Sequence, residues 1–330
     1  MFKFILKRLF YILIVLLLVS GALFALFRTM PGDPVDIHLP PEVAITMRPE
    51  EFLAMRESII QEFGLDQPLV MQYFRWLGAM LRGNFGTSVS TRQPVLDVIR
   101  APMANTIVIN LMNLFLVFSV TIPVGIYCAI KRGKAFDHAA LGFSMFGLSV
   151  PNFIFGLLLM IVFSVFLGIL PISGMRSVVP VGEPGSFPYL MDRLRYMILP
   201  LMTLFLTSLA TLIRMVRSAM IDALSMDFVR TARAKGLGEK AVIYSHAFRN
   251  ALIPIITVMT GWFVGIFSGS LIIEQTFGWQ GMGWLMITAL NARDIPLLMT
   301  MNIFYAFISY AGILVMEIAY VIADPRIRLQ

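Results

Sequence analysis

The sequence predicts an all-α integral membrane protein with six transmembrane helices. The mean hydropathy is +0.82, and 58% of the 330 residues are hydrophobic while only 14% are charged. Soluble domains carry about a quarter charged residues. The third observation is a series of apolar runs, each long enough to supply the roughly 20 residues that cross the hydrocarbon core as a helix.

The first apolar run lies within residues 1–30, where Lys3, Lys7 and Arg8 precede it. It is longer than the apolar region of a secretory signal peptide, and no A-x-A cleavage pattern follows. An uncleaved N-terminal transmembrane helix is therefore favoured. The other five are expected at about 103–130, 140–170, 197–219, 251–273 and 297–322, and Pro151 is expected to kink the third helix of the six.

Residues 31–101 form a small, partly helical insert between the first and second transmembrane helices. One helix is predicted from Pro49, with two acidic residues in its first turn, to a stop at Gly64. A second is predicted in "PLVMQYFRWLGAML", closed by Gly83 and Gly86.

Basic residues indicate which side of the membrane faces the cytoplasm, because short cytoplasmic loops are enriched in Lys and Arg. With six spans, the basic loops and both chain ends fall on one side. The termini, including the tail 323–330, and the loop 220–250 are therefore expected in the cytoplasm, and the 31–101 insert outside. These flanking residues also explain the net charge of +7, so no nucleic-acid partner is expected. The residues concerned are Lys3, Lys7, Arg8, Lys131, Arg132, Lys134, Arg230, Arg233, Lys235, Lys240, Arg249, Arg326 and Arg328.

The loop between the fourth and fifth spans contains "DFVRTARAKGLGEKAVIYSHAFRNALIP", which begins at Asp227. Ala232 and Ala234 favour a short helix, and Gly236 suits a left-handed stop. A second short helix is expected after "GLGEK". The residues alone leave three roles open: a helix lying on anionic lipid, an ordinary solvated loop, or a helix that docks on a protein.

Several motifs in order carry a family resemblance. They are "MPGDP", "GNFGTS", "RTARAKGL" followed by "HAFRNALIP", "EQTFGWQGMGWL" and "ADPRIRLQ". Together they resemble the inner-membrane permeases of binding-protein-dependent ABC importers, in the dipeptide/oligopeptide/nickel branch. The loop departs from the short EAA form at Arg230 and Thr231, where that form has Glu and Ala, and this departure is typical of the peptide branch.

The resemblance implies a type I ABC importer permease fold in residues 102–322, in the membrane of a prokaryotic cell. It implies a second homologous permease subunit, one or two cytoplasmic ABC ATPase subunits, and an extracytoplasmic substrate-binding protein. ATP and Mg would bind to the ATPases, because this chain has no phosphate-binding loop of its own and is not an enzyme. The implied ATPase-coupling residues are Arg230, Thr231, Ala232, Arg233, Ala234, Lys235, Gly236 and Leu237.

Two further features of the apolar core are candidates for the transport path. Gly261, Gly265 and Gly269 recur every four residues and predict a helix-packing seam, within the chain or between two permeases. Glu274, at the external end of the fifth span, and Glu317, near the cytoplasmic end of the sixth, are candidate gate residues, with an interfacial and a structural role as alternatives.

The predicted function is the permease of an ATP-driven importer of di- or oligopeptides, with nickel or another small solute as the alternative cargo. A secondary carrier is disfavoured because the spans nearly lack ionisable residues. A membrane scaffold is the other alternative from a different class. The scattered histidines and the single Cys128 predict no metal site.

Overall fold

The computed structural model describes residues 2–29, 35 and 48–323, and these fold almost entirely as helices. Five helices are long and apolar enough to cross a membrane, and a bent pair of helices brings the number to as many as six. The prediction of an all-α membrane protein with six spans is thereby confirmed. No strand longer than an isolated bridge occurs in the described part of the chain.

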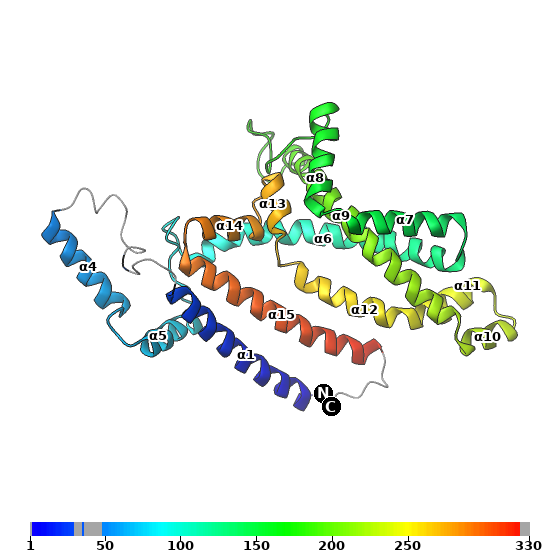
Figure 1. Cartoon of the computed structure of the whole chain (residues 1–330), viewed down its shortest axis with the longest axis horizontal. Helices are drawn as coiled ribbons and strands as arrows, with labels where there is room; N and C mark the ends of the chain where they lie inside the picture. Colours follow the sequence, from blue (N-terminus) through cyan, green and yellow to red (C-terminus); the bar gives the residue numbers. More distant parts are fainter. Residues whose placement is uncertain (1, 30–34, 36–47, 324–330) are drawn as a thin grey trace. The chain divides into compact units, whose positions relative to one another are not determined.

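The helices fall into two compact units. One contains residues 103–284 with the chain from residue 311 onward, and the other contains residues 2–102 and 285–310. The second unit carries α1 (Phe2–Arg28), α4 (Pro49–Phe63), α5 (Leu69–Leu81), most of α14 (Met282–Asn291) and the start of α15 (Ile295–Ala323) (Figure 1).

Both helices predicted in the insert are present. Pro49 begins α4, and Gly64 ends it in the left-handed conformation at φ +63°. In α5, Tyr73 reaches α1, where its hydroxyl lies 2.9 Å from Ser20 Oγ. The Phe24 ring meets Tyr73 at 5.6 Å between centroids. These contacts join the insert to the first transmembrane helix within the same unit.

Asp294, just before α15, accepts several hydrogen bonds within this unit. Its carboxylate accepts hydrogen bonds from Ser88 Oγ at 2.6 Å and Ser90 Oγ at 2.8 Å, and it caps α15 by accepting from the Leu297 N–H. The Asp294 side chain is completely buried. These bonds fix the last part of the insert against the start of the last transmembrane helix.

The first unit contains α6 (Val95–Ile130, in large part), α7 (Ala135–Ser149), α8 (Asn152–Met160) with the π-helical η1 (Ile161–Phe166), and α9 (Phe187–Leu224). The expected kink at Pro151 is a full break, because the two halves of the third span meet at 97°. Val150 adopts the extended conformation that a following proline imposes.

The fifth span differs most from expectation. The predicted second loop helix is not separate, since α11 (Glu239–Ala241), the π-helical η2 (Val242–Ala247) and α12 (Phe248–Gly265) run on as one apolar helix. This helix then stops at Gly265, short of the expected end at residue 273. A separate short helix, α13 (Leu271–Phe277), follows.

Candidate functional site: the loop helix and its anchorage

The predicted loop helix exists as α10 (Asp227–Ala234) and has two distinct faces. Val229 and Ala232 are buried, at 0% and 4% exposure. Seven of the eight predicted coupling residues are exposed: Arg230, Thr231, Arg233, Ala234, Lys235, Gly236 and Leu237. Ala232 therefore anchors the helix, and the other predicted residues form its outward surface.

The helix ends in the glycine stop that the sequence predicts. Gly236 has φ +78°, a conformation that disfavours any residue with a Cβ. The Leu237 N–H donates to Ala232 O at 3.3 Å and the Gly236 N–H donates to Arg233 O at 2.9 Å. This pair of bonds is a Schellman motif, which satisfies the last carbonyls of the helix and reverses the chain.

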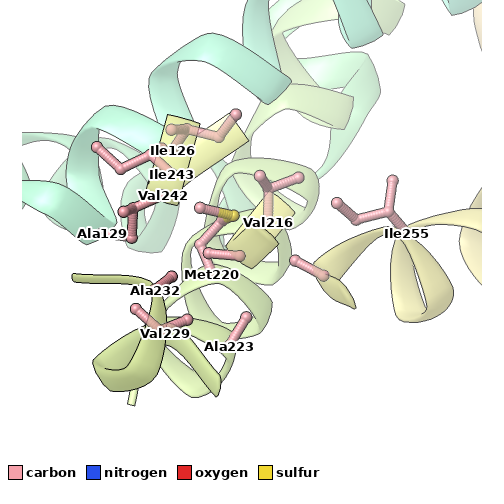
Figure 2. Packing of buried hydrophobic residues seen from close by; sticks show 12 residues of the cluster. Ile126, Ala129, Val216, Met220, Ala223, Val229, Ala232, Val242, Ile243 and Ile255 are labelled. Carbon is pink, nitrogen blue, oxygen red and sulfur yellow. The ribbon is translucent and has the colours of Figure 1, made fainter. Parts of the chain in front are cut away.

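A hydrophobic cluster holds α10 against three other helices. Figure 2 shows Val229 and Ala232 beside Met220 and Ala223 of α9, and the η2 residues beside the end of α6. Burial of apolar surface stabilises such a contact by about 25 cal/mol per Å². The cluster contains Ile126, Ala129, Val216, Met220, Ala223, Val229, Ala232, Val242, Ile243, Ala247, Ala251 and Ile255.

The outward surface of α10 is cationic and partly ordered by ion pairs. Arg233 forks across the turn to Glu239, with Nε 2.8 Å from Oε1 and Nη2 3.3 Å from Oε2. Arg230 lies 3.8 Å from Asp227 and is 80% exposed. A short, firmly anchored helix with a cationic exposed surface can dock on a partner without first paying the entropy of ordering a loop.

A buried ion pair near this cluster was not predictable from the sequence. Arg217 of α9 forks onto Asp137 of α7, with Nη2 2.7 Å from Oδ2, and the Gly133 N–H also donates to Asp137 at 2.9 Å. The Asp137 side chain is 1% exposed. Because 80 residues separate the two partners, no short sequence motif could have predicted the pair.

The structure does not bring the three predicted seam glycines onto one helix face. Gly261 and Gly265 lie in α12, and a Cβ added at either would meet no described atom within 4 Å. Gly269 lies beyond the end of α12, where an added Cβ would clash with the Gly283 backbone and the Glu274 carboxylate. Close packing within the chain therefore involves Gly269, while the other two leave open space.

Glu274 is buried and does not lie at an open surface. It is 3% exposed and accepts hydrogen bonds from Thr106 Oγ1 at 3.0 Å and the Trp284 N–H at 2.9 Å. It thereby caps the start of α14. Glu317, the other candidate gate residue, is half-buried in α15, in the same unit.

The "GWQGMGWL" segment contains a buried aromatic residue. Trp279 is completely buried. Its Nε1–H donates to Asn105 O at 3.3 Å, and the Arg193 guanidinium lies 5.9 Å from the centre of its ring. Within the described residues, no group of three His, Cys, Asp or Glu side chains is placed to hold a metal ion.

Comparisons with known proteins cover nearly the whole chain. Residues 121–329 match the family described as "Binding-protein-dependent transport system inner membrane component". Residues 1–112 match the model of the N-terminal part of such membrane components.

Two curated relatives are similar over their full length. The oligopeptide transport system permease protein AppB of Bacillus subtilis is 35% identical over 99% of each chain. The di/tripeptide transport system permease protein DppB of Pseudomonas aeruginosa is 36% identical over 100% of each chain. A solved structure of the MetNI methionine ABC transporter matches with 16% identity and a TM-score of 0.48, covering 66% of this chain and 94% of that one.

The family model and the full-length relatives agree with the motifs that carry the resemblance. They identify a transport subunit of the membrane rather than an enzyme, a secondary carrier or a scaffold. The chain belongs to the family of inner membrane components of binding-protein-dependent transport systems.

Proposed function

We propose that this chain is one of two permease subunits of an ATP-driven importer of di- and oligopeptides. The observation that carries the proposal is α10, a short helix with a buried anchoring face and an exposed cationic face. The names of the relatives support peptides as the cargo. In this proposal, α10 docks on a cytoplasmic ABC ATPase, which binds ATP and Mg.

The anchorage of α10 supplies a physical route for coupling. Val229 and Ala232 pack against α9, and the same cluster includes the ends of α6 and α12. Close-packed interiors transmit displacement rather than absorb it. An ATPase that moves α10 therefore moves the ends of three spans together. The Asp137–Arg217 pair extends the connection to α7, the first half of the broken span.

In this proposal the chain has a defined orientation in the membrane and assembles with other subunits. The basic residues of the loops support a topology with the chain ends, the loop 220–250 and the tail 323–330 in the cytoplasm. The 31–101 insert then faces an extracytoplasmic substrate-binding protein. A second homologous permease subunit completes the translocation path, with Glu317 and residues 102–322 contributing this chain's half.

A pair of glycine substitutions tests the coupling role of α10. Gly236→Val places a β-branched residue at φ +78°, which costs about 1–3 kcal/mol and distorts the turn. Gly238→Val is the matched control, because Gly238 lies in the same loop at φ −65° and an added Cβ there meets nothing within 4 Å.

The measurement is uptake of trialanine and ATP hydrolysis by the importer reconstituted with its ATPases and binding protein. We expect Gly236→Val to lower uptake per ATP hydrolysed at least tenfold, a change that corresponds to about 1.4 kcal/mol of coupling. Gly238→Val is expected to behave as wild type. Wild-type coupling in Gly236→Val at normal expression would refute the assignment of α10, and a wild-type complex that imports no peptide would refute the cargo.

A further inference from the structure

A groove between α6 and α12 holds a polar group whose hydrogen bonding is incomplete. The cavity measures about 240 Å³ and is lined by Asn110, Asn113, Gly261, Trp262 and Gly265, among others. All of these residues belong to the first unit. The groove lies midway along α6, well away from the α10 cluster, and has no part in the coupling described above.

Asn113 is the unusual member of this lining. Its side chain is 7% exposed, and its Oδ1 has no hydrogen-bond partner in the structure. Leaving a buried acceptor unpaired costs about 1–3 kcal/mol. The Nδ2 of Asn110, one turn earlier, donates to the carbonyls of Gly265 at 3.0 Å and Ile266 at 3.2 Å, where α12 ends. Asn113 lines the groove, and its covered Oδ1 is left without a hydrogen-bond partner among the described residues.

The two glycines of α12 keep this groove open. A Cβ at Gly261 or Gly265 would meet no described atom within 4 Å, so larger side chains would project into free space. The wall between them is Trp262, whose ring packs on Phe118 at 5.8 Å between centroids. The groove thus offers an amide, an aromatic wall and room for a ligand.

A second cavity, of about 510 Å³, lies at the break in the third span and shares Trp262 with the first. Its lining includes Ser149, Asn152, Thr207 and Thr211. Irregular backbone at membrane depth is tolerated where it lines a water-filled cavity, and broken helices often mark the binding sites of transporters. Both cavities have mixed polar and apolar linings and share Trp262.

We propose that the groove at Asn113 is a peptide-contact subsite of the translocation path, in which the Asn113 amide pairs with a main-chain peptide group of the passing substrate. This inference rests on the proposed function. The Asn113 side-chain amide carries a carbonyl acceptor and two N–H donors, and a peptide group carries one acceptor and one donor, so the two can pair in either orientation of the Asn113 side chain. Contact with the main chain favours peptides of many sequences, and Trp262 supplies apolar surface for their side chains.

Three variants of the reconstituted importer test this subsite. Asn113→Leu removes the amide at similar size, and Gly265→Leu fills the groove. Gly142→Leu is the matched control, because Gly142 is also a helical glycine with nothing within 4 Å of an added Cβ. With trialanine as the probe, we expect the first two to lower the maximal import rate about tenfold while ATP hydrolysis persists, and the control to stay within about twofold.

The outcomes separate this subsite from the proposed function. Normal import by Asn113→Leu would overturn the subsite while leaving the importer intact. Loss of peptide import by the wild-type complex would overturn the function itself. Loss of the second permease from purified Gly265→Leu complexes would show that the groove is a subunit interface, which also overturns the subsite.

A second measurement does not depend on how the variants fold. A tripeptide that carries a photoreactive benzoylphenylalanine is irradiated during turnover of the wild-type complex, and the labelled residues are located by mass spectrometry. Labelling within residues 110–114 or 261–266 is expected. Labelling of this chain confined to other segments would overturn the proposal.

Discussion

Two groups of glycines, close together in the sequence, have opposite effects on packing. Gly261 and Gly265 leave open space beside α12, since a Cβ at either meets nothing within 4 Å. Gly269, Gly281 and Gly283 allow backbone to pack directly on backbone and on the Glu274 carboxylate, where an added Cβ would lie under 3.0 Å from other atoms. The first group leaves unoccupied space beside the helix, and the second group permits close packing of neighbouring segments.

The difference arises from where α12 ends. A regular spacing of four residues predicts one continuous face only while the helix continues. The helix stops at Gly265, and Asn110 bonds the carbonyls released there. Gly269 is consequently part of the turn that leads into α13, where it meets the start of α14. The same residue type at the same spacing therefore serves two different structures.

The largest expected effect is that of Gly269→Ala. The added methyl would overlap the Gly283 backbone and approach Glu274 Oε1 to 2.7 Å. Because backbone cannot move aside as a flexible side chain can, we expect destabilisation of about 3 kcal/mol, at the upper end for overpacking. Thermal unfolding in detergent measures it, with Gly142→Ala as the control. An unfolding midpoint equal to that of the control would show that this region is not tightly packed.

Thr106→Val is expected to have the next largest effect. The Thr106 hydroxyl donates to Glu274 and accepts from the Met282 N–H at 2.7 Å. Valine keeps the shape but leaves both groups unpaired in a buried place, at a cost of about 2 kcal/mol. Thr276→Val is the control, since its hydroxyl bonds back to Ile272 O in its own helix. Equal unfolding midpoints for the two variants would contradict the network.

Local chemical signals made much of the fold predictable. Apolar runs located the spans, Pro49 and Gly64 bounded α4, and Gly236 ended α10 as expected. Each of these signals depends on residues a few positions apart. They made α10 accessible to sequence analysis before any tertiary contact was known.

Features that depend on distant contacts were not predictable. The Asp137 and Arg217 partners are 80 residues apart, and Thr106, which donates a hydrogen bond to Glu274, is 168 residues away from it. Trp279, an aromatic residue near a span end, is buried through contacts with Asn105 and Arg193. Composition predicts where a helix lies but not which side chains it will meet.

The pH dependence of stability should report on the tightly packed glycine group, because the Glu274 carboxylate lies against Gly269 and Gly281. The expected effect is smaller than that of the two substitutions above. Burial raises the pKa of the Glu274 carboxyl, against the lowering effect of its hydrogen bonds. The folded chain then holds this proton more tightly than the unfolded chain. Its stabilising contribution is complete below the unfolded pKa and is lost as pH rises through the folded pKa.

Glu274→Gln isolates this effect because it removes the titration and nearly preserves the shape. One proton changes the free energy of unfolding by at most about 1.4 kcal/mol per pH unit. We expect the wild-type unfolding midpoint to fall more steeply than that of Glu274→Gln as the pH rises above the ordinary pKa of a glutamate carboxyl. Parallel curves for the two proteins would mean that Glu274 does not titrate differently on folding.

The smallest effect is expected for Gly261→Ala, and the informative result is whether this substitution stabilises or destabilises the protein. Alanine in a helix interior is favoured over glycine by about 0.5–1 kcal/mol, and no described atom opposes its methyl group. The isolated chain should therefore gain slightly in stability. If the same substitution destabilises the complex with a second permease but not the isolated chain, the open face of α12 is covered by that partner. If the gain persists in the complex, the space beside Gly261 stays free after assembly, as a path for substrate requires.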